Sequence, residues 1–500
     1  MSTVLGSEAD TDGAHAPANS VRQQALHSLR TRSTTRRVQV LAGTAIVALI
    51  ALCVTSVVAL TQARDGIQVM GYTTGPQVVE TANLYYALSD MDAQVANVLV
   101  IGDEHELGDG REAALETYEQ RREEANEALV EVAQLTEDDP SEQQTVEELL
   151  DGLAAYDELR AEAILLSEQA DHPPGDLPEG VREVYDEAAD IMRVELLPNA
   201  YDLTLERGSL VQTTYAEKYA WVIGGAIAAA VVGLVAVLAL IRLQVYLRRR
   251  FRRSVSPVLV VATLGTVAFM AGITAFLLVE ARHLQTAKED GFDSVLALAS
   301  ARADATVNHA DQSRYLIAPE EATQYEEMFL ENSQSILDVS TGTGNENQGP
   351  DDLDEYRELV ADSVLDAEEG TLDQPLGGLL GEEFEDSELE GHDTAILTVL
   401  QNYNGFQVSD ETTRAMAERG NTRGAIQFLV SSSGGEGTYA FNQFDTAISE
   451  LTELHQETFD DAIAAGERGL TTVTVAVPAL TILLAGFVIA AARPRLAEYR

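Results

Sequence analysis

The chain of 500 residues carries 82 acidic and 32 basic side chains, which give a formal net charge of −50. This acidity argues against nucleic acid and anionic lipid as partners of the acidic segments. The single cysteine, Cys53, excludes an intramolecular disulfide, so any folded domain must be held together by packing alone.

Four uncharged apolar runs interrupt the chain. Each is long enough, at about 1.5 Å per residue, to cross roughly 30 Å of hydrocarbon. The predicted transmembrane helices cover residues 38–63, 219–241, 254–279 and 469–492. Cys53 lies within the first run, but Leu52 before it is not the small residue that a lipoprotein cleavage site requires. This run is therefore interpreted as an uncleaved anchor.

The segment between the second and third spans, residues 242–253, is rich in arginine and contains no acid. A short basic loop of this kind stays on the cytoplasmic side of the membrane. Both termini are then cytoplasmic, and residues 64–218 and 280–468 lie outside, in a multi-pass protein of the plasma membrane. We interpret the clustered arginines as topology determinants that contact membrane lipid, with docking of a cytoplasmic protein as the alternative. They are Arg248, Arg249, Arg250, Arg252 and Arg253.

The cytoplasmic pieces are too small for a catalytic domain. They are the N-terminal arm 1–37, the arginine hinge 242–253 and the tail 493–500. Residues 1–20 have a composition typical of disorder, and residues 22–37 are predicted to form a short basic helix. No kinase, phosphatase or nucleotide-binding domain fits into these pieces. We therefore expect no enzymatic activity in the chain, and catalytic output only from a partner.

The first external segment, 64–218, is predicted to be an up-down four-helix bundle, because apolar residues recur at helical spacing and turn residues separate the runs. The expected helices cover 68–101, 111–135 and 141–170, and a fourth begins at Pro178 or Glu179 and continues into the second span. Together the two external segments hold 78 acidic and 18 basic residues, which is interpreted as a solvated surface.

The second external segment, 280–468, repeats this order with longer loops. Helices are expected over 281–317, 319–339, 353–369, 388–402, 409–419 and 439–468, with a short one capped by Asn421. Residues 340–352 are predicted to be a flexible loop, and a Gly/Pro/acid stretch precedes residue 388. The fold class is therefore all-α, with a duplicated span–bundle–span plan. We infer that one chain builds what a bundle receptor normally builds by homodimerisation, so a further homo-oligomer stays open.

No motif of catalysis or cofactor binding is present. The eight histidines form no HExxH pattern, and the glycines of residues 434–438 are not followed by the Lys-Ser/Thr of a phosphate loop. We therefore predict no catalytic residue, cofactor or metal ligand. Asp92 and Asp304 lie on apolar faces of their helices, and a buried carboxylate needs a partner. Both are interpreted first as members of internal ion pairs or hydrogen bonds, and alternatively as coupling or ligand residues.

Three stretches carry a resemblance to a known family. They are LSDMDAQVANVLVIGD (88–103), YEQRREEANEAL (118–129) and YDEAADIMRVELLPNAYDL (185–203). With AFNQFD (440–445) and the four-span duplicated plan, they resemble the actinobacterial membrane protein family called GlnX. The resemblance implies a role between an extracytoplasmic amino-acid-binding lipoprotein and the cytoplasmic serine/threonine protein kinase G. Through that kinase, aspartate or glutamate availability would control nitrogen and carbon metabolism. The resemblance assigns no ligand residues.

The leading hypothesis is a non-enzymatic transmembrane transducer of amino-acid availability, in which bundle helices continue into the spans and a slide of about 1–2 Å crosses the membrane. One alternative is direct sensing, with a small molecule bound between bundle helices. Another is a structural envelope protein that carries no signal. A transporter is disfavoured, because the spans contain no charged residue and no pair of broken helices.

Overall fold

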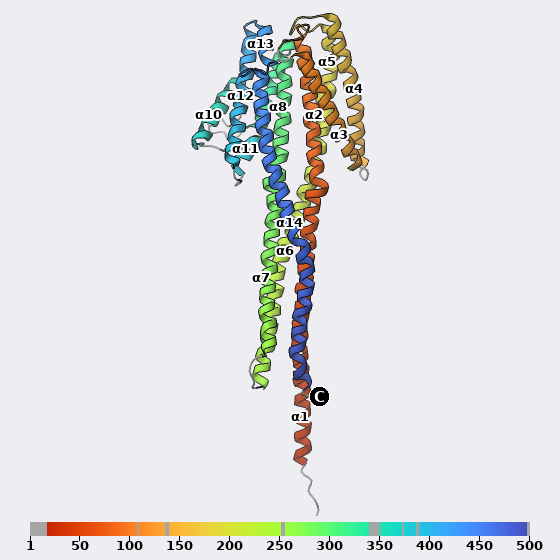
Figure 1. Cartoon of the computed structure of the whole chain (residues 1–500), viewed down its shortest axis with the longest axis vertical. Helices are drawn as coiled ribbons and strands as arrows, with labels where there is room; N and C mark the ends of the chain where they lie inside the picture. Colours follow the sequence, from red (N-terminus) through yellow and green to blue (C-terminus); the bar gives the residue numbers. More distant parts are fainter. Residues whose placement is uncertain are drawn as a thin grey trace, which may run out of the picture. The chain divides into compact units, whose positions relative to one another are not determined.

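The computed structural model confirms an all-helical protein (Figure 1). It describes residues 18–107, 110–135, 140–251, 256–339, 350, 352–372, 375–386, 389 and 391–497. Within these ranges the backbone forms α-helices, three short π-helices and one isolated antiparallel bridge between Asp338 and Gly377, but no strand.

The first half contains α1 (Ala18–Gln68), η1 (Val69–Thr73), α2 (Thr74–Ile101), α3 (Arg111–Leu135), α4 (Pro140–Ala170), α5 (Glu179–Ile191), η2 (Met192–Leu196) and α6 (Leu197–Phe251). The second half contains α7 (Pro257–Thr286), η3 (Ala287–Asp293), α8 (Ser294–Ile317), α9 (Ala322–Ile336), α10 (Leu353–Glu369), α11 (Gly378–Asp386), α12 (His392–Glu418), α13 (Thr422–Leu429) and α14 (Gly437–Ala497). Each half opens with a long helix, a π-helix and a second helix, an order that agrees with the predicted duplication.

The chain divides into two compact units, which we call the span unit and the bundle unit. The span unit comprises residues 1–62, 221–279 and 470–500, and the bundle unit comprises residues 63–220 and 280–469. The two external segments, which the sequence presents as separate bundles, thus belong to one compact body. Hydrophobic burial explains this, because Leu316, Ile426 and Leu429 of the second half complete the core of the first.

Within the bundle unit, α2 and α8 pack against each other along the middle (Figure 1, orange and green). Helices α3, α4 and α5 lie on the side of α2, and α10 to α13 lie on the side of α8. The second half has its own aromatic core, in which Phe329, Tyr403, Phe406 and Phe444 are fully buried. The contact between α2 and α8 therefore joins two hydrophobic cores.

Among the described residues, four helices are long and apolar enough to cross a membrane, which supports a multi-pass membrane protein. Small residues bring these helices close together, as is usual in membranes. A Cβ added to Gly225 of α6 would lie 2.3 Å from the Cβ of Ala59 of α1. A Cβ on Gly265 of α7 would similarly lie 2.8 Å from Leu484 of α14. Cys53 is a free, partly exposed cysteine.

The π-helices η1 and η3 each present a glycine to α14 of the bundle unit. A Cβ on Gly71 of η1 would lie 2.5 Å from a side-chain carbon of Ile463, and one on Gly291 of η3 would lie 2.7 Å from the Cβ of Phe459. Contacts shorter than 3.0 Å are essentially never seen, so α14 approaches both π-helices as closely as only glycine permits.

Two stretches differ most from the sequence expectation, whereas α9 (Ala322–Ile336) is only a few residues shorter than the helix expected over 319–339. Helix α12 runs unbroken through residues 403–408, where two helices had been expected, because Tyr403 and Phe406 both anchor it in the aromatic core. Helix α11 forms inside the Gly/Pro/acid stretch, where Leu380 is completely buried. Tertiary burial overrides weak local propensity at both places. By contrast, α10 has the predicted bounds, and the side chain of Asn421 caps α13 as predicted.

The arginine hinge is largely helical, because α6 extends to Phe251. Arg248 and Arg249 are exposed near its end, and Arg250 lies in the same helix. Arg252 and Arg253 lie outside the described residues, as do residues 1–17 of the arm, 340–349 and 351 of the predicted loop, and 498–500 of the tail. The predicted roles of the hinge, as a lipid contact or a docking surface, stay predictions.

Candidate functional site

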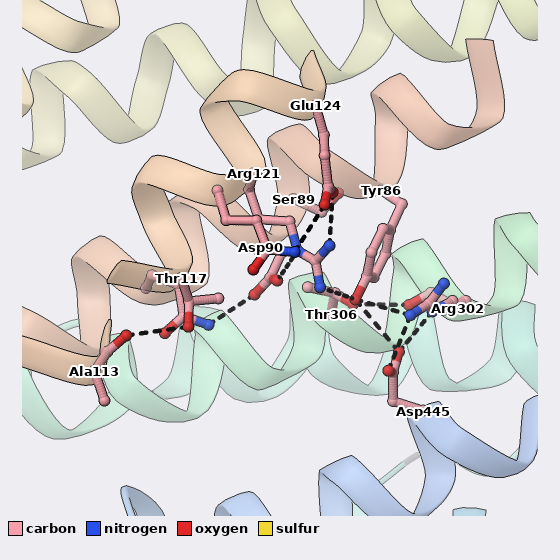
Figure 2. A network of polar contacts seen from close by, with 12 residues as sticks. Tyr86, Ser89, Asp90, Ala113, Thr117, Arg121, Glu124, Arg302, Thr306 and Asp445 are labelled. Atoms are coloured by element: carbon pink, nitrogen blue, oxygen red, sulfur yellow. Dashed lines mark hydrogen bonds and ion pairs between the residues drawn. The ribbon is translucent and has the colours of Figure 1, made fainter. Parts of the chain in front are cut away.

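A cluster of polar side chains surrounds Tyr86 where α2, α3, α8 and α14 meet. We call Tyr86, Asp90, Arg121, Arg302 and Asp445 the Tyr86 network. Figure 2 shows both arginines directed toward Tyr86. The Arg302 guanidinium lies 3.9 Å and the Arg121 guanidinium 4.9 Å from the centroid of its ring. Both also donate hydrogen bonds to its hydroxyl oxygen, at 3.0 and 3.1 Å.

Each arginine of the network is held by a carboxylate. Arg121 of α3 donates to Asp90 of α2 at 2.6 Å. Arg302 of α8 donates to Asp445 of α14 at 2.6 and 2.9 Å. Tyr86 and Asp90 are four residues apart on α2 and therefore lie on one helical face. The network thus links two ion pairs, one within the first half and one within the second, through a single phenol.

The electrostatic setting keeps Tyr86 neutral. Burial raises its pKa, and the neighbouring carboxylates of Asp90 and Asp445 raise it further, against the opposing effect of Arg302 and Arg121. A neutral phenol can accept from both guanidinium groups and donate its own proton. Its hydroxyl lies 3.5 Å from Asp445 and is directed toward this acceptor (Figure 2). Tyr86 is therefore an uncharged bridge between the two ion pairs.

A polar cavity of about 220 Å³ opens beside this network. Side chains from both halves surround it with donors and acceptors. They include Tyr86, Asp90, Gln94, Asn97, Thr117, Arg121, His309, Thr438, Asn442 and Asp445. The volume is below the roughly 300–1,000 Å³ of sites for drug-sized ligands, so it suits a small polar solute. Its wall carries charges of both signs, from Asp90, Asp445 and Arg121.

A second, more apolar cavity of about 320 Å³ shares Tyr86 and Arg302 with the Tyr86 network. Val78 and Ala82 of α2, and Phe292 and Val295 of η3 and α8, form much of its wall. The side chain of Tyr86 therefore borders both cavities. A solute in one cavity would act on a residue that also lines the other.

Asp92 is fully buried, as its position on α2 predicts, but its partners come from both halves. Arg314 of α8 forms an ion pair with Asp92, and Tyr156 of α4 donates to it at 3.2 Å. Nη1 of Arg314 donates a hydrogen bond to Asp311 at 2.5 Å, and Nε of Arg314 donates one to the hydroxyl of Tyr185 at 3.2 Å. We call Asp92, Arg314 and Asp311 the Arg314 triad. Asp92 is therefore a member of an internal ion pair that joins the two halves of the chain.

Asp304 is only partly buried and lies in a different environment from Asp92. It accepts hydrogen bonds from Tyr85 at 3.0 Å and from Ser335 at 3.2 Å. Burial raises its pKa to about 6, although both hydrogen bonds favour the charged form. The structure places neither Asp92 nor Asp304 in the Tyr86 network, and their roles as ligand or coupling residues stay predictions.

Asp304→Asn is expected to change the pH dependence of stability. Because the folded-state pKa of Asp304 is above its ordinary value of 3.8, wild-type stability should fall as pH rises from about 4 to about 6 and stay lower above that. The asparagine variant lacks this fall, so it should be more stable by about 1–2 kcal/mol near pH 7.5 after allowance for partial exposure. Melting temperatures near pH 4 should coincide, and a constant difference at both pH values would contradict this prediction.

Sequence reasoning did not find the Tyr86 network. Asp90 is visible in the sequence only as one of many paired acids, and Arg121 as one of several charges on an exposed-looking helix. The spacing of Tyr86 and Asp90 on one face of α2 is the local signal that could have marked them. Their partners Arg302 and Asp445 are more than two hundred residues away, so only the packing of the halves reveals them.

The fold defines a multi-pass membrane protein whose helical bundle unit contains the Tyr86 network. Residues 66–216 match the model of a family described as the actinobacterial sensor domain. The match supports a sensor protein of actinobacteria, and it covers Tyr86, Asp90 and Arg121 but not Arg302 or Asp445. Searches of curated proteins and of solved structures return no significant match.

Proposed function

We propose that this protein is a non-enzymatic transmembrane sensor that binds a small amino-acid-type solute at the Tyr86 network. The polar cavity carries this proposal, because a guanidinium and two carboxylates of opposite halves line one small space. The match of residues 66–216 to an actinobacterial sensor domain supports the sensor role.

The proposed recognition uses exchange of ion pairs. The ligand carboxylate competes with Asp90 for Arg121, whose planar guanidinium suits two parallel hydrogen bonds. The ligand ammonium pairs with Asp90 or Asp445. Aspartate or glutamate would bring a second carboxylate, for which Arg302 is the other guanidinium of the network, although Arg302 lines the second cavity and not the polar one. Each exchange alters a contact between α2, α3, α8 and α14, which gives the ligand a differential affinity for two arrangements of these helices.

Continuous helices offer the route for the signal. The backbone is helical from α1 through η1 to α2, from α7 through η3 to α8, and along the whole of α14. A displacement of about 1–2 Å along such helices is typical of transmembrane switching. We place both termini and the arginine hinge in the cytoplasm of the cell, with the plasma membrane as the location, on the basis of the arginine distribution.

The partners of this sensor follow from the resemblance to the GlnX family. In that version, a solute-binding lipoprotein loaded with aspartate or glutamate meets the bundle unit, and a cytoplasmic serine/threonine kinase receives the signal at the hinge or the N-terminal arm. Co-purification of both partners with tagged full-length protein supports the relay. Recovery of neither from folded protein leaves direct binding in the polar cavity as the input.

Arg121→Met is expected to weaken ligand binding. Calorimetry on the detergent-solubilised full-length protein should detect the binding of aspartate or glutamate. The variant should bind this ligand about 10- to 100-fold more weakly, because a charge-assisted hydrogen bond contributes roughly 1.5–3 kcal/mol. Arg122→Met is the matched control, since the neighbouring Arg122 pairs with Glu119 and Asp157 outside the polar cavity.

Two results would count against direct binding at this site. The first is equal affinity in wild type and Arg121→Met. The second is the absence of heat with any amino acid in protein whose circular dichroism shows native helix content. In the second case, addition of the loaded lipoprotein to the same sample separates a partner-mediated input from no input at all.

A further inference from the structure

A separate cluster of buried side chains lies in the second half of the bundle unit, where α11, α12 and α14 meet. Glu383 comes from α11, His392 is the first residue of α12, and His455 comes from α14. Their side chains are almost entirely buried, with 6%, 1% and 0% of the surface exposed. One ligand atom from each residue lies within 4.8 Å of the other two. The cluster has no part in the Tyr86 network.

Both histidines direct Nε2 at the same oxygen of Glu383. Nε2 of His392 lies 3.1 Å and Nε2 of His455 lies 2.9 Å from Oε1. On the other side of the His455 ring, Nδ1 lies 2.6 Å from the backbone oxygen of Asp290, so Nδ1 carries the proton and donates it. In neutral His455, Nε2 therefore presents a lone pair to a carboxylate oxygen.

This arrangement leaves Nε2 of His455 without a satisfied hydrogen bond. Although Glu383 is close, Nε2 is buried and makes no hydrogen bond of acceptable geometry. A buried lone pair that faces a carboxylate is electrostatically unfavourable unless a positive charge lies between them. A proton or a metal cation can supply that charge.

We propose that Glu383, His392 and His455 form a site for a divalent transition metal ion of the Zn²⁺ type. Two imidazoles and one carboxylate are a ligand set that favours zinc and its neighbours over calcium or magnesium. Ligands about 2.0–2.1 Å from a tetrahedral ion lie roughly 3.3 Å apart, close to the two Nε2–Oε1 distances. The two distances thus match a coordination sphere after small side-chain shifts.

The surroundings supply the outer hydrogen bonds that metal-binding side chains normally have. A backbone carbonyl fixes the ring of His455 through Nδ1, which is the usual way to orient a histidine ligand. The hydroxyl of Ser294 lies close to Glu383, and it donates to the backbone oxygen of Glu289 at 3.4 Å. The three side chains fill three of the four positions of a tetrahedral ion and leave the fourth for a water molecule. Because all three are buried, an external substrate would not reach the ion, and its role would be in stability.

The position of the site indicates which helices the metal ion would hold together. It would tie α11, α12 and α14 together through side chains 9 and 63 residues apart in sequence. Through His455 it would also fix the carbonyl of Asp290, which belongs to η3. Since π-helices are often found at functional sites, the ion would stabilise this local geometry at the start of α8. This inference does not depend on the Tyr86 network as a ligand site.

The test uses detergent-solubilised full-length protein that has been stripped with a chelator and then dialysed against Zn²⁺. Elemental analysis should give one zinc per chain, and the melting temperature should rise by roughly 5 °C or more over the stripped protein. Co²⁺ in place of Zn²⁺ should produce the visible absorption of a tetrahedral site. Glu383→Gln and His455→Gln should each lose this absorption and the bound metal.

His172→Gln is the matched control, because His172 is also buried but bonds to Ser167 and its own loop, away from the three ligands. It should retain one zinc per chain. Wild-type protein that binds neither Zn²⁺ nor Co²⁺ overturns the proposal and identifies the cluster as a proton-bridged ion triad. Equal metal content in wild type, Glu383→Gln and His455→Gln also overturns it, since the metal would then be bound elsewhere. The Co²⁺ spectrum of the wild type decides the question even if a variant does not fold.

Discussion

Arg314→Met is expected to lower the free energy of unfolding by about 3–5 kcal/mol, the usual cost of removing one partner from a buried ion pair. The variant leaves the buried carboxylates of Asp92 and Asp311 without the cation that they share. Arg314 is 1% exposed, so water cannot replace the lost partner. Thermal unfolding of the full-length protein, followed by circular dichroism, should show a drop of several degrees or more.

Two comparison variants test the cause of this loss. Arg423→Met removes an ion pair with Glu104 whose arginine side chain is 63% exposed, so it should cost less than about 1 kcal/mol. The triple variant Asp92→Asn, Asp311→Asn, Arg314→Met removes all three charges and should recover much of the stability, because neutral groups avoid the charge penalty. If the triple variant were as unstable as Arg314→Met, packing and not charge would explain the effect.

Gly291→Val is expected to be the second most damaging change. A Cβ at this position would lie 2.7 Å from the Cβ and 2.9 Å from the Cα of Phe459. Backbone atoms cannot rotate away as a side chain can, so α14 or η3 must move. Overpacking of this kind costs about 1–3 kcal/mol, with a matching fall in melting temperature.

Gly405→Ala is the matched control at another helical glycine, and it should have the opposite effect on stability. Gly405 lies inside α12, and a Cβ there meets no atom within 4 Å. Alanine should therefore stabilise the protein by roughly 0.5–1 kcal/mol, through lower entropy of the unfolded chain. Gly291→Val with an unchanged melting temperature would show that α14 does not pack against η3 as described.

The sequence predicts most helices of this protein, because their signals are local. The four spans follow from long uncharged runs, and the start of α5 follows from Pro178, which is its N-cap. The packing of α2 against α8 depends on residues far apart in the sequence. The burial of Leu380, which keeps α11 helical, depends on distant residues as well. The π-helices are not predicted from the sequence either, because one extra residue per turn is not visible in the apolar pattern.

The candidate sites show the same division between local and distant information. The buried position of Asp92 can be read from its spacing to Leu88 and Val95, but its partner Arg314 is 222 residues away. The metal-type cluster is equally hidden, because His392 and His455 lie on different helices and fit no histidine motif. Side chains that act together here come from separate helices, which a search for short motifs cannot assemble.

The joining of two helical halves in one bundle unit removes a constraint that symmetry imposes on homodimeric receptors. In a homodimer, each residue at the central contact appears twice, so a substitution changes two places at once. Here Tyr86 of α2 meets Arg302 of α8 and not a second Tyr86. The two faces can therefore diverge independently, and the Tyr86 network occurs once in each chain. Under the proposed function, one copy of the chain would bind its ligand along a simple saturation curve, without the cooperativity that paired identical sites permit.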